Sequence, residues 1–575
     1  MALFTIEKVG DADTKFTWLT SEFDRQSFIS NQDNNFVFTS TRPVIKNASE
    51  EFRFAEAVPS LKEMIRSSQN DYAGFQYETG LNDFTLTANS ARFTRARIYC
   101  IVQKSKIIFS NSLKELVPFS ERRMNPAAAY SILKYGETPE YVNFLADIFS
   151  IPASTYLVIN KNKFESFLNT GTIGFEHFVN FFQISFEGDG GNITNTARKL
   201  DSLFTLLGNI PVVVPISGGV DSTVINHLIN KHSSSAYPGF FLQFGPDDLE
   251  IEFALKAAKD TKAELEICQM NPTDFQPAFE FQIDKLNQPL GESSAIAMAH
   301  YFRNTGIKDR FVIDGTLADG TYGSTNYNKP LWANQKQKSL LEQRAAEFIL
   351  AFIQSNNLKS LDRFFPRDSL QKDEYVRFLH QYLGPFANTW FSNAGPYTDS
   401  LVKYWNFYYN MIAEKSRSDE WARYTIFKMV NYACKNNTAK TFDLARPKNN
   451  AFYPFTWKEV LEDQSHYSWK EKTTGNIVKY PLKKILESYI GKDFIYRKKV
   501  GLNSSFEDWI STDSNKKYLI ALIDRPDGIA EFMIGRKKKK LTAIYKSGNI
   551  HPNLSRLIIN LAIQQAWIDK HGIIL

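Results

Sequence analysis

The clearest change of hydrophobic pattern along the chain lies between residues 211 and 230. Three consecutive valines, Val212–Val214, predict a short buried strand. A glycine-rich turn, Ser217–Ser222 (SGGVDS), follows, and apolar residues then recur at helical spacing from Val224 to Ile229. A strand, a tight turn and a helix in this order form a cradle for an anion, because the first turn of a helix offers unpaired N–H groups and a positive dipole end.

Strand and helix patterns continue to alternate as far as residue 313. We predict strands at Gly239–Gly245, Leu265–Met270 and Arg310–Ile313, and a helix at Glu250–Thr261. Such alternation favours a parallel sheet with helices on both faces. In sheets of this kind ligands bind beyond the carboxyl ends of the strands, which is where SGGVDS and Phe244 fall.

The first 186 residues follow a different pattern of short β-rich runs separated by turns, at 36–38, 97–102, 106–109 and 155–159. Glu187–Asn192 (EGDGGN) is typical of a linker, and Ile193–Leu207 predicts a helix that leads into the Val212 strand. The expected fold class is therefore α/β, with an α+β domain over residues 1–186 and a parallel-sheet domain over 193–575. A helical, aromatic-rich insert is expected at about 328–420.

Composition narrows the class of protein. The chain of 575 residues is 43% hydrophobic and 23% charged, which is typical of a soluble globular protein with two or more domains. The net charge of only +6 gives no reason to expect a nucleic-acid partner, and the basic run at 537–540 is expected to be a solvated surface loop. Three widely spaced cysteines favour a reducing compartment, and no apolar stretch has membrane-spanning length, so we expect a cytoplasmic protein without a membrane partner. A homodimer is left open.

The residues of the turn suit phosphate binding individually. Gly218 and Gly219 allow close approach of a phosphate because they carry no Cβ, while Ser217 and Ser222 add hydroxyl donors. Asp221 is placed to hold Mg²⁺ against that phosphate. The motif SGGVDS in its strand–turn–helix context resembles the PP-loop of the ATP pyrophosphatases, which cleave ATP between the α- and β-phosphates. ATP and Mg²⁺ are therefore the expected cofactors.

Further segments resemble the asparagine synthetases and the related β-lactam synthetases. Val312–Gly323 (VIDGTLADGTYG) resembles their pyrophosphate loop, which implies that Asp319 is the second Mg²⁺ ligand and that Gly315 contacts the nucleotide. A turn or helix-cap role is the alternative for Asp319. The resemblance also implies that main chain near Val214 and Phe244 holds the adenine.

Three other segments extend the resemblance. Asn287–Ile296 resembles a segment that contributes to the substrate pocket of these synthetases. Lys479 begins KYPLKKIL, and the resemblance implies that this lysine reaches the reacting phosphate and carbonyl; Pro481 fits the first turn of the helix that would follow it. The segment Arg497–Leu502 resembles a terminal basic-glycine segment, which implies a similar catalytic role for Lys499.

Some positions depart from the family pattern. Asparagine synthetases carry acids where this chain has Thr316 and Gly320, which puts asparagine formation in doubt. The N-terminal region weakly resembles a class II glutamine amidotransferase domain, at 71–75, 109–112 and 151–156, but that domain begins with a catalytic cysteine where this chain has Ala2. Cys100 lies in an apolar strand pattern typical of an inert core thiol, so we expect no glutaminase activity.

These observations predict an ATP-dependent, AMP-forming ligase. It would adenylate a carboxylate of a small molecule or peptide and couple it to an amine that does not come from glutamine, as in β-lactam synthetases or lasso-peptide cyclases. An ammonia-dependent asparagine synthetase and a nucleotide-binding pseudoenzyme are the alternatives.

Overall fold

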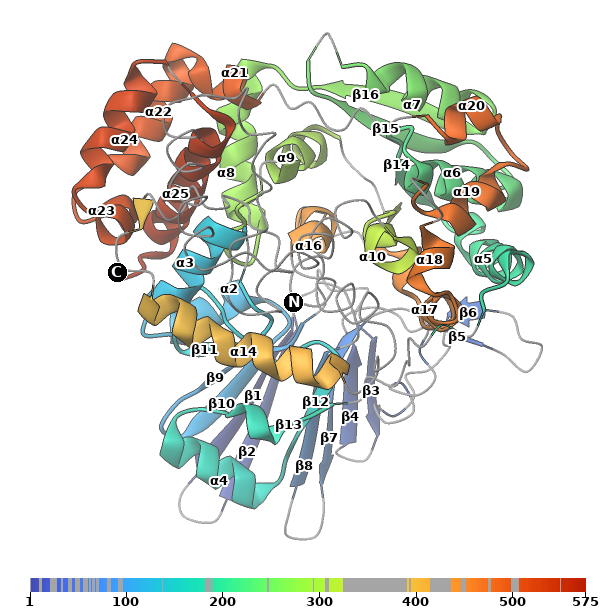
Figure 1. Ribbon diagram of the computed structural model, residues 1–575. Coiled ribbons are helices and arrows are strands. Elements are labelled where there is room, and N and C mark those ends of the chain that lie inside the picture. The colour runs from blue at the N-terminus through green and yellow to red at the C-terminus, as the bar shows by residue number, and fades with distance from the viewer. Residues whose placement is uncertain are drawn as a thin grey trace, which may run out of the picture.

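The computed structural model describes the strands and a few single residues between 2 and 90 and then, with short gaps, residues 97–323, 390–391, 395–413, 436–445, 451–497 and 506–575. Two antiparallel sheets occupy the N-terminal region, and a parallel sheet with helices on both faces follows (Figure 1). The predicted α/β class is thus confirmed.

The two antiparallel sheets pack face to face. The first contains, in order, β11 (Ile148–Ser150), β9 (Tyr99–Val102), β10 (Lys106–Ser110), β1 (Ala2–Val9) and β2 (Asp13–Thr20). The second contains β13 (Phe178–Asn180), β12 (Thr155–Ile159), β8 (Phe84–Ser90), β7 (Ala73–Thr79), β4 (Asn35–Thr39) and β3 (Phe28–Gln32); β5 (Val44–Lys46) and β6 (Phe52–Phe54) form a separate pair.

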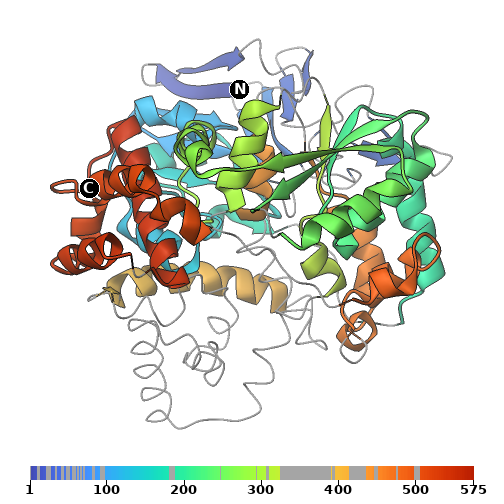
Figure 2. The ribbon, with the colours of Figure 1, turned by 90° about the horizontal axis from the view of Figure 1, so that it is seen from above.

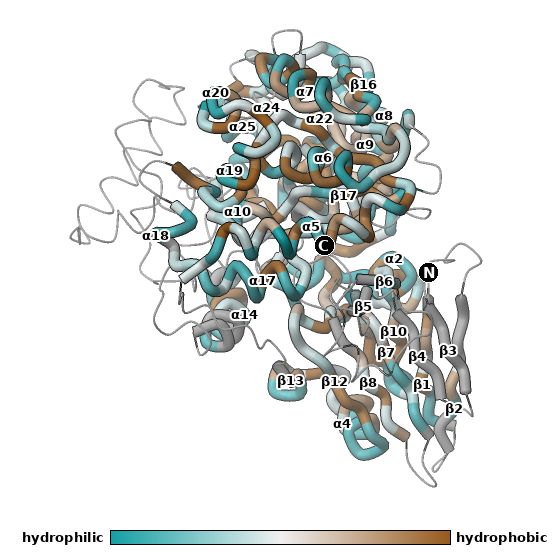
Figure 3. Tube along the Cα trace, turned by 90° about the vertical axis from the view of Figure 1, so that its right-hand side faces the viewer, coloured by the Kyte–Doolittle hydropathy of each residue, from teal (hydrophilic) through white to brown (hydrophobic). Residues whose placement is uncertain are grey.

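Alternation of buried and exposed side chains along the strands explains how the two sheets pack. In β1, Phe4 and Ile6 are buried whereas Lys8 is exposed, as expected for a strand with one face on a core. The ring centroids of Phe4 and Phe75, from the facing sheets, lie 5.3 Å apart. Figure 3 shows these strands at the opposite end of the molecule from the parallel sheet and its helices.

The parallel sheet has the order β16 (Ala263–Gln269), β15 (Tyr237–Gln243), β14 (Val212–Pro215), β17 (Phe311–Ile313) and β18 (Ala451–Phe452). Its helices include α5 (Ile193–Gly208), α6 (Val220–His232), α7 (Glu250–Lys259), α8 (Phe275–Lys285) and α9 (Ser294–Asn304). The apolar sides of α5, α6 and α7 share one core cluster with β14, while α9 packs on the other face, where Phe240 and Tyr301 stack at 3.7 Å. The strands and helices predicted between 193 and 313 are therefore confirmed, with ends that differ by up to three residues.

Shorter helices complete the C-terminal part of the chain: α10 (Ala318–Tyr322), α14 (Gly395–Ala413), α16 (Asn436–Phe442), α17 (Lys458–Ser465), α18 (Trp469–Lys472), α19 (Tyr480–Leu486), α20 (Lys492–Ile495), α21 (Phe506–Ser511), α22 (Asp513–Ile523), α23 (Ile529–Ile534), α24 (Lys537–Lys546) and α25 (Pro552–His571). The basic run at 537–540 is the start of α24, so the expectation of a loop there was wrong. None of the helices in the described part of the chain is both long and apolar enough to cross a bilayer.

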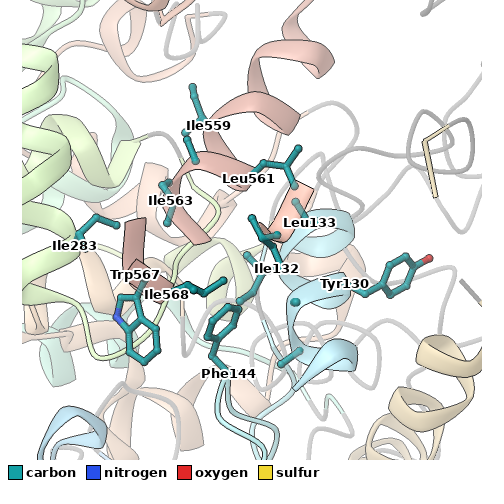
Figure 4. Packing of buried hydrophobic residues seen from close by; sticks show 14 of the residues in the cluster. Tyr130, Ile132, Leu133, Phe144, Ile283, Ile559, Leu561, Ile563, Trp567 and Ile568 are labelled. Atoms are coloured by element: carbon teal, nitrogen blue, oxygen red, sulfur yellow. The ribbon is translucent and has the colours of Figure 1, made fainter. Parts of the chain in front are cut away.

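The C-terminal helix α25 joins the N-terminal region to the rest of the molecule. It packs against the N-terminal helix α3 (Pro126–Tyr135), and the rings of Trp567 and Phe144 meet edge to face with centroids 5.4 Å apart (Figure 4). Gln564 also donates a hydrogen bond to the carbonyl of Ala129 at 3.4 Å. One hydrophobic cluster therefore runs through both regions.

The segment from Asn287 adds polar links across this junction. The Asn287 Oδ1 accepts hydrogen bonds from Ser112 Oγ at 2.9 Å, and its Nδ2 donates to Asp443 at 3.2 Å. The next residue, Gln288, accepts a bond from the Phe144 N–H at 3.2 Å. The first part of the predicted pocket segment thus connects the N-terminal region with Asp443, the residue that follows α16.

The predicted aromatic-rich insert lies outside the described residues except for Trp390, Phe391 and α14. Helix α14 lies alongside α3 (Figures 1 and 2). The ring of Trp405, which is 2% exposed, meets Tyr135 at 5.2 Å, and Tyr404 meets Tyr141 at 5.7 Å. This part of the insert belongs to the core.

We predict that Trp567→Ala lowers the free energy of unfolding by about 3–5 kcal/mol, because it removes a fully buried ring and leaves a cavity. Urea denaturation followed by circular dichroism measures the loss. Trp567→Phe is the matched control: it keeps a ring against Phe144, and it removes an indole N–H that has no hydrogen-bond partner in the described structure. An equal loss in both variants would contradict the prediction.

Candidate active site

The turn after β14 has the geometry of an anion cradle. Residues 216–219 lead directly into α6, whose N-cap is Gly219. The Ser217 N–H donates to Ser222 Oγ at 3.2 Å, the two serine hydroxyls are 3.1 Å apart, and Ser222 Oγ donates to the Gly219 carbonyl at 3.2 Å. Both predicted hydroxyl donors therefore lie together at the N-terminus of a helix, where a phosphate would bind.

Gly218 and Gly219 serve this turn in different ways. Gly218 has φ +67°, and a Cβ there would lie 2.6 Å from Phe253 Cβ on α7, so the turn needs both the left-handed conformation and the close approach. Gly219 has φ −72°, and a Cβ there would meet only Ser217 Oγ, at 3.3 Å. The first glycine is required by the fold of the turn, and the second leaves space for a ligand.

Arg497 fixes the turn from outside. Its Nη2 donates to the carbonyl of Gly218 and to Glu250 Oε2, both at 3.1 Å, and its guanidinium lies 3.6 Å from the centroid of the Phe253 ring. The family resemblance of the segment Arg497–Leu502 points to Lys499 and gives no role to this arginine. Lys499 lies outside the described residues, so its catalytic role stays a prediction.

A charged cluster lies beside the turn. Lys479 Nζ contacts Asp221 Oδ2 at 2.5 Å and Asp319 Oδ1 at 2.6 Å. Lys479 is the N-cap of α19 with Pro481 in the first turn, as predicted, and its φ is +56°. Its side chain reaches Asp221 on α6 and Asp319 on α10. The structure thus brings together three residues that the sequence analysis named separately.

The electrostatics of this cluster keep the lysine charged. Burial by itself would lower the pKa of Lys479, but the charges and hydrogen bonds of Asp221 and Asp319 raise that pKa above its ordinary value. The Lys479 side chain is 10% exposed, so water contributes little to balancing its charge.

The same two carboxylates suit a divalent cation. Both contact one ammonium group, so they lie on either side of the same position beside the phosphate turn, and carboxylate oxygens are the ligands that Mg²⁺ prefers. No cluster of three or more potential metal ligands occurs among the described residues. Mg²⁺ commonly binds through one or two carboxylates together with substrate phosphates and water, so Asp221 and Asp319 fit it.

Gly315 brings the end of β17 against the helix that follows the turn. A Cβ at Gly315 would lie 3.2 Å from Asp221 Cβ and 3.3 Å from Ile225 Cδ1 on α6. This close packing places the residues on either side of Gly315, Asp314 and Thr316, beside the phosphate turn.

A cavity of about 230 Å³ opens between the turn, β15, α9 and α16. Its lining is Pro215, Ile216, Ser217, Phe240, Phe241, Leu242, Phe244, Asp248, Glu250, Ser294, Met298, Asp314, Thr316, Lys440 and Thr441. Phe244 lines the cavity, whereas Val214 is fully buried in β14 and the lining begins at the next residue. The adenine role of the main chain near these two residues stays a prediction.

The polar wall of the cavity contains an acid that the sequence analysis missed. Asp314 Oδ1 accepts hydrogen bonds from Thr316 N–H at 2.8 Å and Thr316 Oγ1 at 2.7 Å, and its Oδ2 accepts one from Thr441 Oγ1 at 3.0 Å. Burial raises the pKa of Asp314 above its ordinary value, although these hydrogen bonds oppose the shift. Its position just after a parallel strand was the signal that could have identified it.

Lys440 extends this wall. Its ammonium pairs with Glu292 and donates a hydrogen bond to Ser294 Oγ at 2.8 Å. The second half of the segment Asn287–Ile296 therefore reaches the cavity through Ser294, and its role in a substrate pocket stays a prediction.

We predict that Gly218→Ala lowers the melting temperature by several degrees and weakens ATP binding at least tenfold, because the added methyl group clashes with Phe253 and the backbone is strained. Calorimetric unfolding and titration with ATP measure both effects. Gly219→Ala is the control for strain, and its melting temperature should stay close to that of the unchanged protein. A normal melting temperature for Gly218→Ala would contradict the geometry of the turn.

We predict that Lys479→Met destabilises the protein because it leaves Asp221 and Asp319 facing each other without a cation. Adding Asp319→Asn should restore part of the lost melting temperature, since it removes the like-charge repulsion. The raised pKa sets the pH window: the contribution of Lys479 is fully present below the pKa of an unfolded lysine and is lost only as pH rises through the higher folded value. The gap between Lys479→Met and the unchanged protein should thus be constant from pH 7 to 9, and a gap that closes in this range would contradict the assignment.

Comparison with known proteins agrees with this geometry. A model of the family described as asparagine synthase matches residues 205–569, which is more than half of the chain and contains the phosphate turn, the charged cluster and the cavity. No curated protein matches the chain. The chain belongs to the asparagine synthase family, whose members are ATP-dependent ligases.

Proposed function

We propose that this protein is an AMP-forming amide ligase, which converts a carboxylate into an acyl-adenylate and then couples it to an amine. The carboxylate belongs to a small molecule or a peptide, as in β-lactam synthetases and lasso-peptide cyclases. The observation that carries the proposal is the cluster of Lys479, Asp221 and Asp319 directly beside a phosphate turn.

In the first step a carboxylate oxygen attacks the α-phosphorus of ATP, and pyrophosphate leaves with the bridging oxygen. The N–H groups at the start of α6 and the hydroxyls of Ser217 and Ser222 bind the phosphates. Lys479 balances the negative charge that develops in a largely buried place, where such an interaction is strong. Mg²⁺ at Asp221 and Asp319 would neutralise phosphate charge and fix the leaving group.

In the second step the nitrogen of the amine attacks the acyl carbon, AMP leaves, and the nitrogen gives up a proton. Cys100 is a poor candidate for releasing that nitrogen from glutamine. Position 2 is alanine, in strand β1. Cys100 is completely buried, and burial raises its pKa to about 12, so it does not form a thiolate near neutral pH.

The acyl substrate differs from aspartate in this proposal. Thr316 offers a hydroxyl in place of the family acid and donates it to Asp314. Gly320 is buried in α10 without any side chain. A pseudoenzyme is disfavoured, because the phosphate turn and the two carboxylates beside it retain the groups that would bind the ATP phosphates and Mg²⁺.

ATP–pyrophosphate exchange tests the proposal. The protein with Mg²⁺ and labelled pyrophosphate is screened against amino acids, dicarboxylates and short peptides. We expect label to enter ATP with at least one carboxylate, and Asp221→Asn to abolish exchange because it removes a predicted metal ligand. Asp260→Asn, an exposed acid at the far end of α7, is the matched control and should leave exchange unchanged. Lack of ATP binding by the unchanged protein would refute the proposal.

A further inference from the structure

The peptide group between Gly218 and Gly219 is held in one orientation by a hydrogen bond from Arg497. The arginine Nη2 donates to the Gly218 carbonyl at 3.1 Å. In a trans peptide the C=O of one residue and the N–H of the next lie in one plane and point in opposite directions. A donor that holds the Gly218 carbonyl therefore also fixes the direction of the Gly219 N–H.

The Gly219 N–H points toward the interior of the phosphate turn. It donates to Ser217 Oγ at 3.4 Å, and Ser217 is one of the residues that line the cavity. Backbone N–H groups that converge in such a turn are the donors that bind phosphate oxygens. The carbonyl of the same peptide would repel a phosphate if the two groups exchanged places.

Such an exchange is easier at this position than elsewhere in the chain. The peptide lies between two glycines, and a glycine adopts positive and negative φ with similar ease. Gly218 has φ +67°, a value that its contact with α7 requires, but this contact leaves the peptide plane after Gly218 without a restraint of its own. The hydrogen bond from Arg497 supplies that restraint.

Arg497 is itself restrained from two sides. Its Nη2 also contacts Glu250 Oε2 at 3.1 Å, and the Glu250 side chain is 9% exposed. The guanidinium lies 3.6 Å from the ring centroid of Phe253 and 5.6 Å from that of Phe494. A lysine has neither the planar group that stacks on a ring nor a second nitrogen, so it cannot reproduce this set of contacts.

We propose that Arg497 is a positioning residue, which locks the Gly218–Gly219 peptide with its N–H directed at the bound phosphates. Arg497 is not among the residues that line the cavity, so it acts through the turn and not on the ligand itself. The inference deepens the proposed function, and it rests on ATP binding at this turn.

Ligands with and without phosphate test this role. Dissociation constants for ATP, pyrophosphate and adenosine are measured with Mg²⁺ by titration calorimetry, and by ligand-observed NMR where binding is weak. We expect Arg497→Lys and Arg497→Ala to bind ATP and pyrophosphate roughly tenfold more weakly, as for the loss of a hydrogen bond to the ligand. Adenosine should bind all three proteins equally, whereas general damage to the fold would weaken all three ligands.

Chemical rescue separates positioning from packing. Methylguanidinium at low millimolar concentration should restore part of the ATP affinity of Arg497→Ala, because it fits against the Gly218 carbonyl, Glu250 and the Phe253 ring. It should not improve binding by the unchanged protein.

Two further variants keep the test decisive. Phe253→Leu removes the ring below the guanidinium but keeps the Cβ that Gly218 approaches, so it should lower ATP affinity by a smaller factor even if Arg497→Ala does not fold. Arg525→Lys is the matched control: Arg525 pairs with Asp569 at 3.2 Å on the surface of the C-terminal helices, and all three affinities should stay unchanged.

The outcomes distinguish this inference from the proposed function. Equal ATP affinity of Arg497→Lys and the unchanged protein, or an equal loss for adenosine and ATP, would overturn the inference. Absence of any ATP binding by the unchanged protein would overturn both proposals. ATP binding without exchange for any carboxylate would refute the ligase proposal alone.

Discussion

The need to balance one buried charge holds the active-site region together. Lys479 and Asp221 are separated by 258 residues, and their side chains meet only when α6, α10 and α19 pack at the carboxyl edge of the parallel sheet. A buried ammonium without a counter-charge would be strongly destabilising, so the cluster forms only in the correct arrangement of these helices. The left-handed turn at Gly218 depends on the same packing, since it presses directly on α7 and is held there by Arg497.

The N-terminal region also supports this arrangement, although none of its residues has a role in the proposed reaction. Asn287 joins Ser112 to Asp443, and five residues later the same segment supplies Glu292, which pairs with Lys440 at the cavity. Helix α25 covers the apolar side of α3 from the other direction (Figure 4). Because these contacts lead from the N-terminal sheets to the cavity wall, a scaffold role explains why such a region accompanies the ligase part of the chain.

Local sequence patterns predicted the parts of the site that are local. The strand, the glycine turn, helix α6 and the placement of Lys479 before Pro481 each depend on a few neighbouring residues, and the structure has them where the pattern put them. The missed features depend on distant partners. Arg497 meets Gly218 across 279 residues, and Thr441 meets Asp314 across 127, so no window of sequence contains either contact. Val214 lies one residue before Pro215, the first residue of β14 that lines the cavity. A sequence pattern of buried residues does not show which residue of the strand is the first to face the cavity.

The structure around the cavity explains the departure from the family pattern at Thr316. Thr316 is not a base, since both its N–H and its hydroxyl are committed to Asp314. The nearest acid of this loop toward β17 is Asp314, two residues earlier, and Thr441 of α16 restrains its carboxyl group. In the proposed reaction the phosphate turn and the Lys479 cluster serve adenylation, whereas Thr316 and Gly320 remove two acids that would be expected for an aspartate substrate, which is the combination that a ligase with a different substrate requires.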